Sequence, residues 1–85
     1  MAKGTVRYWA AAKEAAGVAE EPFEAGTLGE LVAHITLKYE NSDLPRVLRR
    51  CSFLVDGHPA GVRDPHDVEL PDGATVEVLP PFAGG

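Results

Sequence analysis

The spacing of apolar residues predicts one amphipathic helix in the first half of the chain. The apolar positions recur three or four residues apart, which is the spacing of one buried helical face. They are Leu28, Leu31, Val32, Ile35 and Tyr39. Thr27 and Glu30 match a capping box, in which each side chain satisfies a free backbone donor of the other residue. We therefore expect a helix from Leu28 to about Glu40.

Shorter runs of strand-forming or alternating apolar residues predict a sheet. The runs are residues 5–9, 20–25, 51–56, 68–70 and 74–79. Pro22 interrupts the second run, so that strand is expected at a sheet edge or to begin late. Asp56-Gly57 and Pro71-Asp72-Gly73 are turn signals that end one strand and precede the last.

Two further segments predict short helices. Residues 10–16 are rich in alanine and are followed by Gly17, a natural C-terminal cap. Residues 44–50 fit one or two helical turns with Pro45 in the first turn. The order is strand, short helix, strand, long helix, strand, short strand, strand, which predicts a two-layer α+β domain.

The size of the chain restricts its function. With 85 residues it forms one small domain, which uses nearly all its apolar residues for a single core. A carrier, a subunit or a binding module is therefore expected rather than a self-contained enzyme. The formal net charge of −5 repels nucleic acid. It suits a partner with a basic docking face, or serves solubility alone.

The N-terminus has no apolar signal region, and no stretch approaches transmembrane length. These features predict a cytoplasmic protein that does not bind membranes.

A few residues are candidates for chemistry or binding outside the tail. Cys51 lies on the face of the strand that carries Phe53 and Val55, which favours a small core residue over a sulfur relay. His34, His58 and His66 lack the spacing of metal ligands, so no metal site is expected.

The remaining candidates lie near the predicted helix ends. Arg46, Arg49 and Arg50 form a basic cluster that either contacts an acidic partner or lies in solvent at a helix end. Tyr8 and Trp9 fit either the core or an interface.

The last six residues are Pro80-Pro81-Phe82-Ala83-Gly84-Gly85. The two prolines stiffen the exit from the last strand and remove two ladder donors. Phe82 is apolar where a free tail is usually polar, and two glycines allow close approach to the terminal carboxylate. Fully extended, such a tail reaches roughly 20 Å. We expect a domain over residues 1–79 followed by a flexible tail over residues 80–85.

These features resemble the MoaD/ThiS sulfur carriers, which share the ubiquitin-like β-grasp fold, a mixed sheet packed on one main helix. The resemblance covers the whole chain in element order. It is most specific at Pro71-Asp72-Gly73, the last strand and the tail, and Phe53-Leu54-Val55-Asp56-Gly57 resembles the middle strand and turn. The tail is most similar to that of molybdopterin synthase small subunits.

The resemblance implies that the chemistry takes place at the carboxylate of Gly85. An adenylating, E1-like partner would join it to AMP, using ATP and magnesium that this chain does not bind. A sulfur donor protein would then convert the adenylate to a thiocarboxylate. Gly84 would allow close approach, Phe82 would anchor the partner, and Pro81 and Ala83 would complete the docking tail.

The same resemblance implies a large molybdopterin synthase subunit as partner. That subunit would supply the catalytic groups, and this chain would be a non-catalytic subunit that donates sulfur to the pterin precursor. The complex would bury the tail and part of the exposed sheet face.

Other functions fit the same residues. The chain could deliver sulfur to thiamin, cysteine or tRNA, and Ala83 also occurs in tails that resemble the cysteine-pathway carriers. It could be a protein modifier joined through Gly85 to lysines, or a plain interaction domain.

Overall fold

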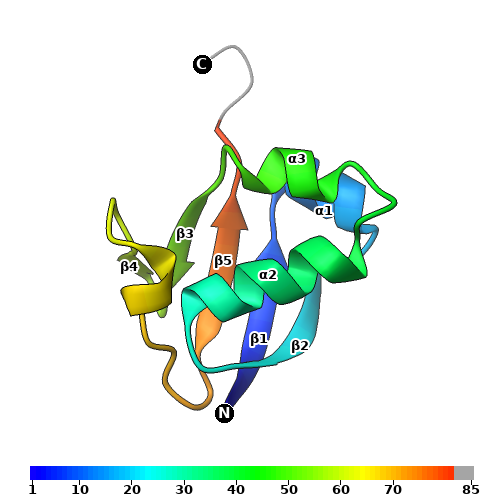
Figure 1. The fold of residues 1–85 in the computed structure, drawn as a ribbon. Helices are drawn as coiled ribbons and strands as arrows, with labels where there is room; N and C mark the ends of the chain where they lie inside the picture. The colour runs from blue at the N-terminus through cyan, green and yellow to red at the C-terminus, as the bar shows by residue number, and fades with distance from the viewer. Residues whose placement is uncertain (82–85) are drawn as a thin grey trace.

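A computed structural model describes residues 1–81 of the chain. Its five strands form one mixed sheet in the order β2-β1-β5-β3-β4, and the helices lie against one face of it (Figure 1). The elements are β1 (Ala2–Tyr8), α1 (Ala10–Ala16), β2 (Glu20–Ala25), α2 (Leu28–Lys38), α3 (Leu44–Leu48), β3 (Ser52–Val55), β4 (His58–Pro59), the 3-10 helix η1 (Pro65–Asp67) and β5 (Thr75–Leu79). The predicted two-layer α+β architecture is confirmed.

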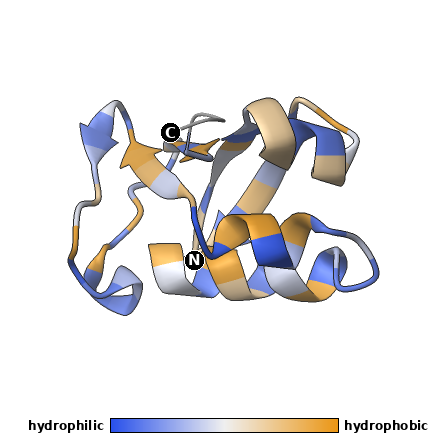
Figure 2. Cartoon of the chain, turned by 90° about the horizontal axis from the view of Figure 1, so that it is seen from above, coloured by the Kyte–Doolittle hydropathy of each residue, from blue (hydrophilic) through white to orange (hydrophobic). Residues whose placement is uncertain are grey.

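The first and last strands lie side by side near the centre of the sheet. β1 and β5 are parallel, with Val6 opposite Val76 and Tyr8 opposite Val78. All four side chains are buried. Figure 2 shows hydrophobic and hydrophilic residues alternating along the turns of α2, the helix at the bottom of that view. The pairs β1–β2, β3–β5 and β3–β4 are antiparallel. β2 is an edge strand, as Pro22 predicts.

Helix α2 buries the predicted apolar face. Leu28, Leu31 and Ile35 are buried in the core that α2 shares with the sheet, and the helix ends at Lys38, two residues before the predicted end. The capping prediction is partly wrong. The Thr27 hydroxyl accepts from the Glu30 N–H at 3.2 Å as expected.

The Glu30 carboxylate, however, accepts from the N–H of Gly26 at 2.8 Å, one residue before the predicted donor. Thr27 is extended and forms an isolated bridge with Glu69. This geometry turns the preceding N–H toward the helix, and the carboxylate satisfies it there.

The two short helices agree with the sequence. α1 has the predicted bounds, and Gly17 caps it in the left-handed conformation with φ of 78°. α3 has Pro45 in its first turn, and its Leu44 and Leu48 are buried.

Other predicted boundaries are wrong. β1 begins at Ala2 rather than at residue 5, because its pairing with β2 extends to Ala25. Residues 58–67, which lie outside every predicted helix and strand, contain β4 and η1. Asp56 and Gly57, both with positive φ, form the two-residue turn that joins β3 to β4.

Residues 68–70 were predicted to be a strand. In the structure they form only the isolated bridge between Thr27 and Glu69. Val68 and Leu70 are nevertheless buried. The alternating pattern at these positions therefore reflects packing into the core rather than pairing in the sheet.

A hydrogen-bonded carboxylate joins β2 to the core and to α2. The hydroxyl groups of Tyr8 and Tyr39 each donate to Glu21 Oε2 at 2.7 Å, and Lys38 forms an ion pair with Oε1. Burial opposes ionisation of Glu21, but the three donors outweigh it and hold the pKa of Glu21 below its ordinary value. Burial, together with the hydrogen bond to the Glu21 carboxylate and its charge, raises the pKa of Tyr39 to about 12.

Replacing Glu21 by Gln is expected to lower the stability at neutral pH by roughly 1–2 kcal/mol, because hydrogen bonds to a charged acceptor are stronger than those to a neutral one. The folded-state pKa of Glu21 lies below the unfolded value. The ionised group therefore stabilises the protein above the unfolded pKa, and this contribution is lost as the pH falls through the folded pKa. Urea unfolding at pH 7 and pH 3 measures both effects.

The matched control is Glu24→Gln, on the same strand but exposed to solvent. It should leave the urea midpoint nearly unchanged at both pH values. Equal midpoints for the wild type and Glu21→Gln at pH 7 would show that this network adds no net stability.

Candidate functional site

Pro81 is the last described residue of the predicted tail. Phe82, Ala83, Gly84 and Gly85, to which the sequence assigns docking and chemistry, lie outside the described residues. The structure therefore defines the surface from which the tail begins. We call the two prolines at the start of the tail, Pro80 and Pro81, the tail root.

The tail root lies at the end of the sheet where β1 passes into α1. Leu79 makes the last pair of β5 with β3, and the Trp9 N–H donates to the Val78 carbonyl at 3.2 Å. Pro80 and Pro81 have no N–H and so cannot extend the ladder. The chain leaves the sheet at the end where α1 and α3 lie (Figure 1).

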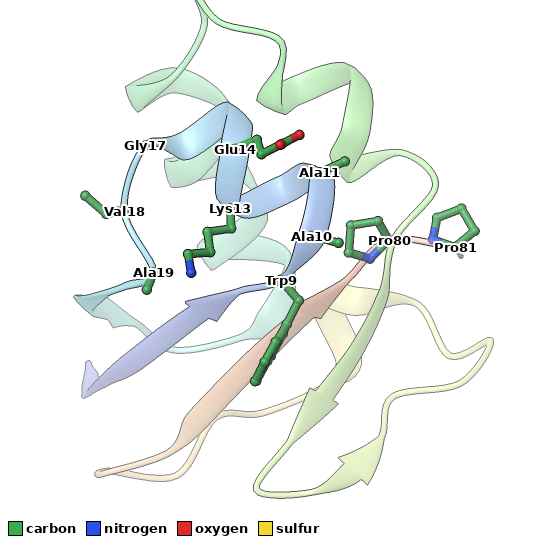
Figure 3. A pocket seen from close by; sticks show the side chains of 10 residues that line it. All are labelled: Trp9, Ala10, Ala11, Lys13, Glu14, Gly17, Val18, Ala19, Pro80 and Pro81. Atoms are coloured by element: carbon green, nitrogen blue, oxygen red, sulfur yellow. The ribbon is translucent and has the colours of Figure 1, made fainter. Parts of the chain in front are cut away.

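A groove of about 820 Å³ opens on one side of the tail root. Figure 3 shows Pro80 and Ala10 beside each other, with Trp9 below them and Val18 on the far wall. Most of the lining side chains are small or apolar, with Lys13 and Glu14 as the charged exceptions. The groove therefore suits an apolar segment better than a charged one.

Trp9 is held on the outer face of the sheet. Its indole N–H donates to the Glu77 carboxylate at 3.2 Å, and the Arg7 guanidinium lies 5.0 Å from the ring centre, a cation–π distance. The side chain is 40% exposed. By contrast, Tyr8 is only 2% exposed. The two residues that sequence left undecided therefore separate into a core tyrosine and a surface tryptophan.

A second groove of about 400 Å³ lies on the α3 side of the tail root. Ala11, Val47 and the two prolines form its apolar walls, and Arg46 and Arg50 add positive charge. The predicted basic cluster thus borders the tail root. Arg46 also forms an exposed ion pair with Asp43 at 2.7 Å.

Cys51 has the character of a packed side chain. It is half-buried against the core, and its thiol donates to the Val47 carbonyl at 3.2 Å. Burial raises the pKa of Cys51 to about 11. The thiolate, which is the nucleophilic form, is therefore scarce near neutral pH.

The three histidines are all exposed. Among residues 1–81, no three His, Cys, Asp or Glu side chains gather in a way that would hold a metal ion. Within the same residues, no helix is long and apolar enough to cross a membrane.

Comparison with known proteins decides the family. Residues 6–85 match the family described as the ThiS family. The chain belongs to the ThiS family. A relative from Chlamydomonas reinhardtii named "Molybdopterin synthase sulfur carrier subunit" is 34% identical over 83 residues, covering 94% of this chain and 95% of the relative.

Two solved structures show the same fold. The small archaeal modifier protein 1 of Methanosarcina acetivorans has a TM-score of 0.84 at 24% identity, covering 100% of this chain and 98% of its own. The complex of subunits 1 and 2 of molybdopterin-converting factor from Helicobacter pylori contains a chain with a TM-score of 0.69 at 28% identity, covering 98% and 99%. The predicted ubiquitin-like β-grasp fold is confirmed.

Sequence reasoning named Trp9 and the basic cluster as candidates but did not place them beside the tail, and it did not identify the other walls around the tail root. Trp9 and Ala11 lie at the start of α1, Val18 lies in the loop after it and Val47 in α3, and these residues share no motif. The signals available in the sequence were an apolar residue, Val18, directly after the predicted helix cap Gly17, and the arginines between positions 46 and 50.

Cys51 in the folded protein should react with iodoacetamide at pH 8 on the order of 100-fold more slowly than the same residue after unfolding. A pKa of about 11, compared with an ordinary value of ~8.5, leaves far less thiolate. The rate is measured by intact mass over time, with and without urea. Equal rates would show that the thiol is accessible and activated.

Proposed function

We propose that this chain is a sulfur carrier that acts as the small subunit of a molybdopterin synthase. The observation that carries the proposal is its 34% identity, over nearly the full length of both chains, to a relative named as the sulfur carrier subunit of that enzyme. Membership of the ThiS family supports the same class of function. Here Gly85 is the reacting residue.

The chemistry begins with a carboxylate, which is a poor acyl donor because its leaving group would be oxide. Reaction with ATP on an adenylating partner converts the Gly85 carboxylate to an acyl adenylate and releases pyrophosphate. A sulfide equivalent from a sulfur donor protein displaces AMP and leaves a thiocarboxylate. ATP and magnesium belong to the partner in this scheme.

The tail root supports this role by its position. β5 ends at Leu79 and two prolines direct the chain away from the ladder. Residues 82–85 add a further reach of about 13 Å when extended, at about 3.3 Å per residue. The carboxylate of Gly85 can therefore enter a partner's site while the folded domain stays outside.

A large subunit supplies the catalytic groups in this proposal. One chain of the Helicobacter pylori complex of subunits 1 and 2 of molybdopterin-converting factor is 28% identical to this one. By analogy, the large subunit takes the tail into its own site and receives the sulfur there. Phe82 is the apolar anchor of that contact.

The deciding experiment is intact mass spectrometry after incubation with ATP, magnesium, the adenylating partner and a sulfur donor. We expect a gain of about 16 mass units, the replacement of one oxygen by sulfur, and fragmentation that places it on Gly85. Adducts of higher mass that resist reducing agent would instead indicate a protein modifier. No gain with a competent partner would contradict sulfur loading.

Deleting Gly84 and Gly85 should abolish sulfur loading and leave the fold intact. The buried core includes no residue after Val78 among those described, so the urea midpoint of the truncated chain should match the wild type. A truncated chain that still supports molybdopterin formation would contradict the proposed role of the tail.

Phe82→Ala should weaken binding to the large subunit by about 2 kcal/mol, or roughly 30-fold in Kd, the usual result of removing an aromatic anchor from an interface. Isothermal titration calorimetry gives the Kd. The matched control is Leu37→Ala, which removes another large apolar side chain, one on α2 that is itself 68% exposed. Unchanged affinity of the Phe82 variant would show that this residue does not contribute to the interface.

A further inference from the structure

The chain is acidic overall but basic beside the tail root. Three of its eight Lys and Arg residues, Arg46, Arg49 and Arg50, fall within five positions, in a chain whose net charge is −5. Leu44 and Leu48 of α3 are buried. The arginines therefore lie on the exposed side of this segment.

The charge of this cluster is little neutralised by the rest of the described chain. Within residues 1–81 the salt bridges include Arg46–Asp43, but neither Arg49 nor Arg50 takes part in one. Arg46 and Asp43 are themselves 77% and 59% exposed. Their attraction is weak in water, and Arg46 can exchange its partner at small cost.

Two of the arginines border the tail root directly. Arg46 and Arg50 line the groove of about 400 Å³ whose other walls are Ala11, Val47, Pro80 and Pro81. A protein that takes up the residues after Pro81 must approach this groove. It then meets two guanidinium groups set against an apolar wall.

A helix dipole accounts for only part of this arrangement. Positive charge near a helix C-terminus is favourable, but α3 has only five residues, and the dipole does not require the arginines to flank the tail root. Guanidinium groups pair well with carboxylates, often through two parallel hydrogen bonds. A polyanion such as nucleic acid is repelled by the remaining surface.

We infer that Arg46, Arg50 and the groove between α3 and the tail root form a docking surface for an acidic segment of the adenylating partner. The segment carries at least two carboxylates, next to an apolar residue that contacts Val47 and Pro81. Docking there holds the domain while residues 82–85 reach the site of adenylation. This inference rests on the proposed function, because it requires a partner that takes up the tail.

Steady-state kinetics of adenylation test this surface. The initial rate of pyrophosphate release is measured with the purified adenylating enzyme over a range of carrier concentrations. We expect Arg46→Glu/Arg50→Glu to raise the KM for the carrier about tenfold or more at low salt, with kcat changed less than twofold. The difference should shrink at about 0.5 M salt, where exposed charges are screened.

The matched control is Lys3→Glu/Arg63→Glu, which changes the net charge by the same amount at exposed sites outside the groove. It should alter KM less than twofold. Arg46→Gln/Arg50→Gln should raise KM by a smaller factor than the Glu variant. This neutral variant keeps the test valid if charge reversal disturbs folding, which urea midpoints report.

Three outcomes would overturn the inference. An equal rise in KM for both charge reversals would show a long-range effect of net charge, not local docking. An unchanged KM for the arginine variants would show that the adenylating partner does not dock on this surface, even if assembly with a large subunit were weakened. Absence of pyrophosphate release with the wild-type chain would count against both the proposed function and the inference.

Discussion

The parallel pairing of β1 with β5 is the constraint on which the rest of the structure depends. It brings residues about 70 positions apart into register, from Thr5 opposite Thr75 to Tyr8 opposite Val78. Val6 and Val76 are thereby buried next to each other under the helices. Because β5 is central and ends beside Trp9, this pairing also sets the place and direction in which the tail leaves the domain.

The three α-helices differ in what they contribute to the core and to the surface around that exit. α2 covers the sheet with its buried apolar face, and the Glu21 network ties it to β2. The shorter α1 and α3 add less to the core, but they supply the walls of the two grooves that flank Pro80 and Pro81. The helix that contributes most to the core is thus a different one from those that line the grooves.

The chemistry assigned to the chain needs little from the folded domain. The described residues present no metal cluster, and burial keeps the single cysteine, Cys51, protonated. In the proposed function the reacting group belongs to the tail, and its activation depends on other proteins. In the same proposal the domain provides recognition, through an apolar groove on one side of the tail root and positive charge on the other.

The sequence by itself determined the local elements and the fold class. The predicted bounds of α1 match the structure at both ends, because an alanine-rich run ends at a glycine that adopts the left-handed cap conformation. The buried face of α2 followed from its periodicity, and the edge position of β2 from Pro22. The tail and turn motifs indicated the family, which the match over residues 6–85 confirms. These features depend on neighbours within a few positions along the chain.

Only the tertiary structure decided what depends on distant contacts. Residues 68–70 alternate like a strand, yet they pack into the core and form a single bridge with Thr27. Pattern alone cannot separate burial in a core from pairing in a sheet, since both bury every second side chain. For the same reason, no periodicity predicts the two grooves to which Trp9, Ala11, Val47 and Pro80 contribute. Their proximity follows from the β1–β5 pairing and the packing of α1 on α3, which the fold alone establishes.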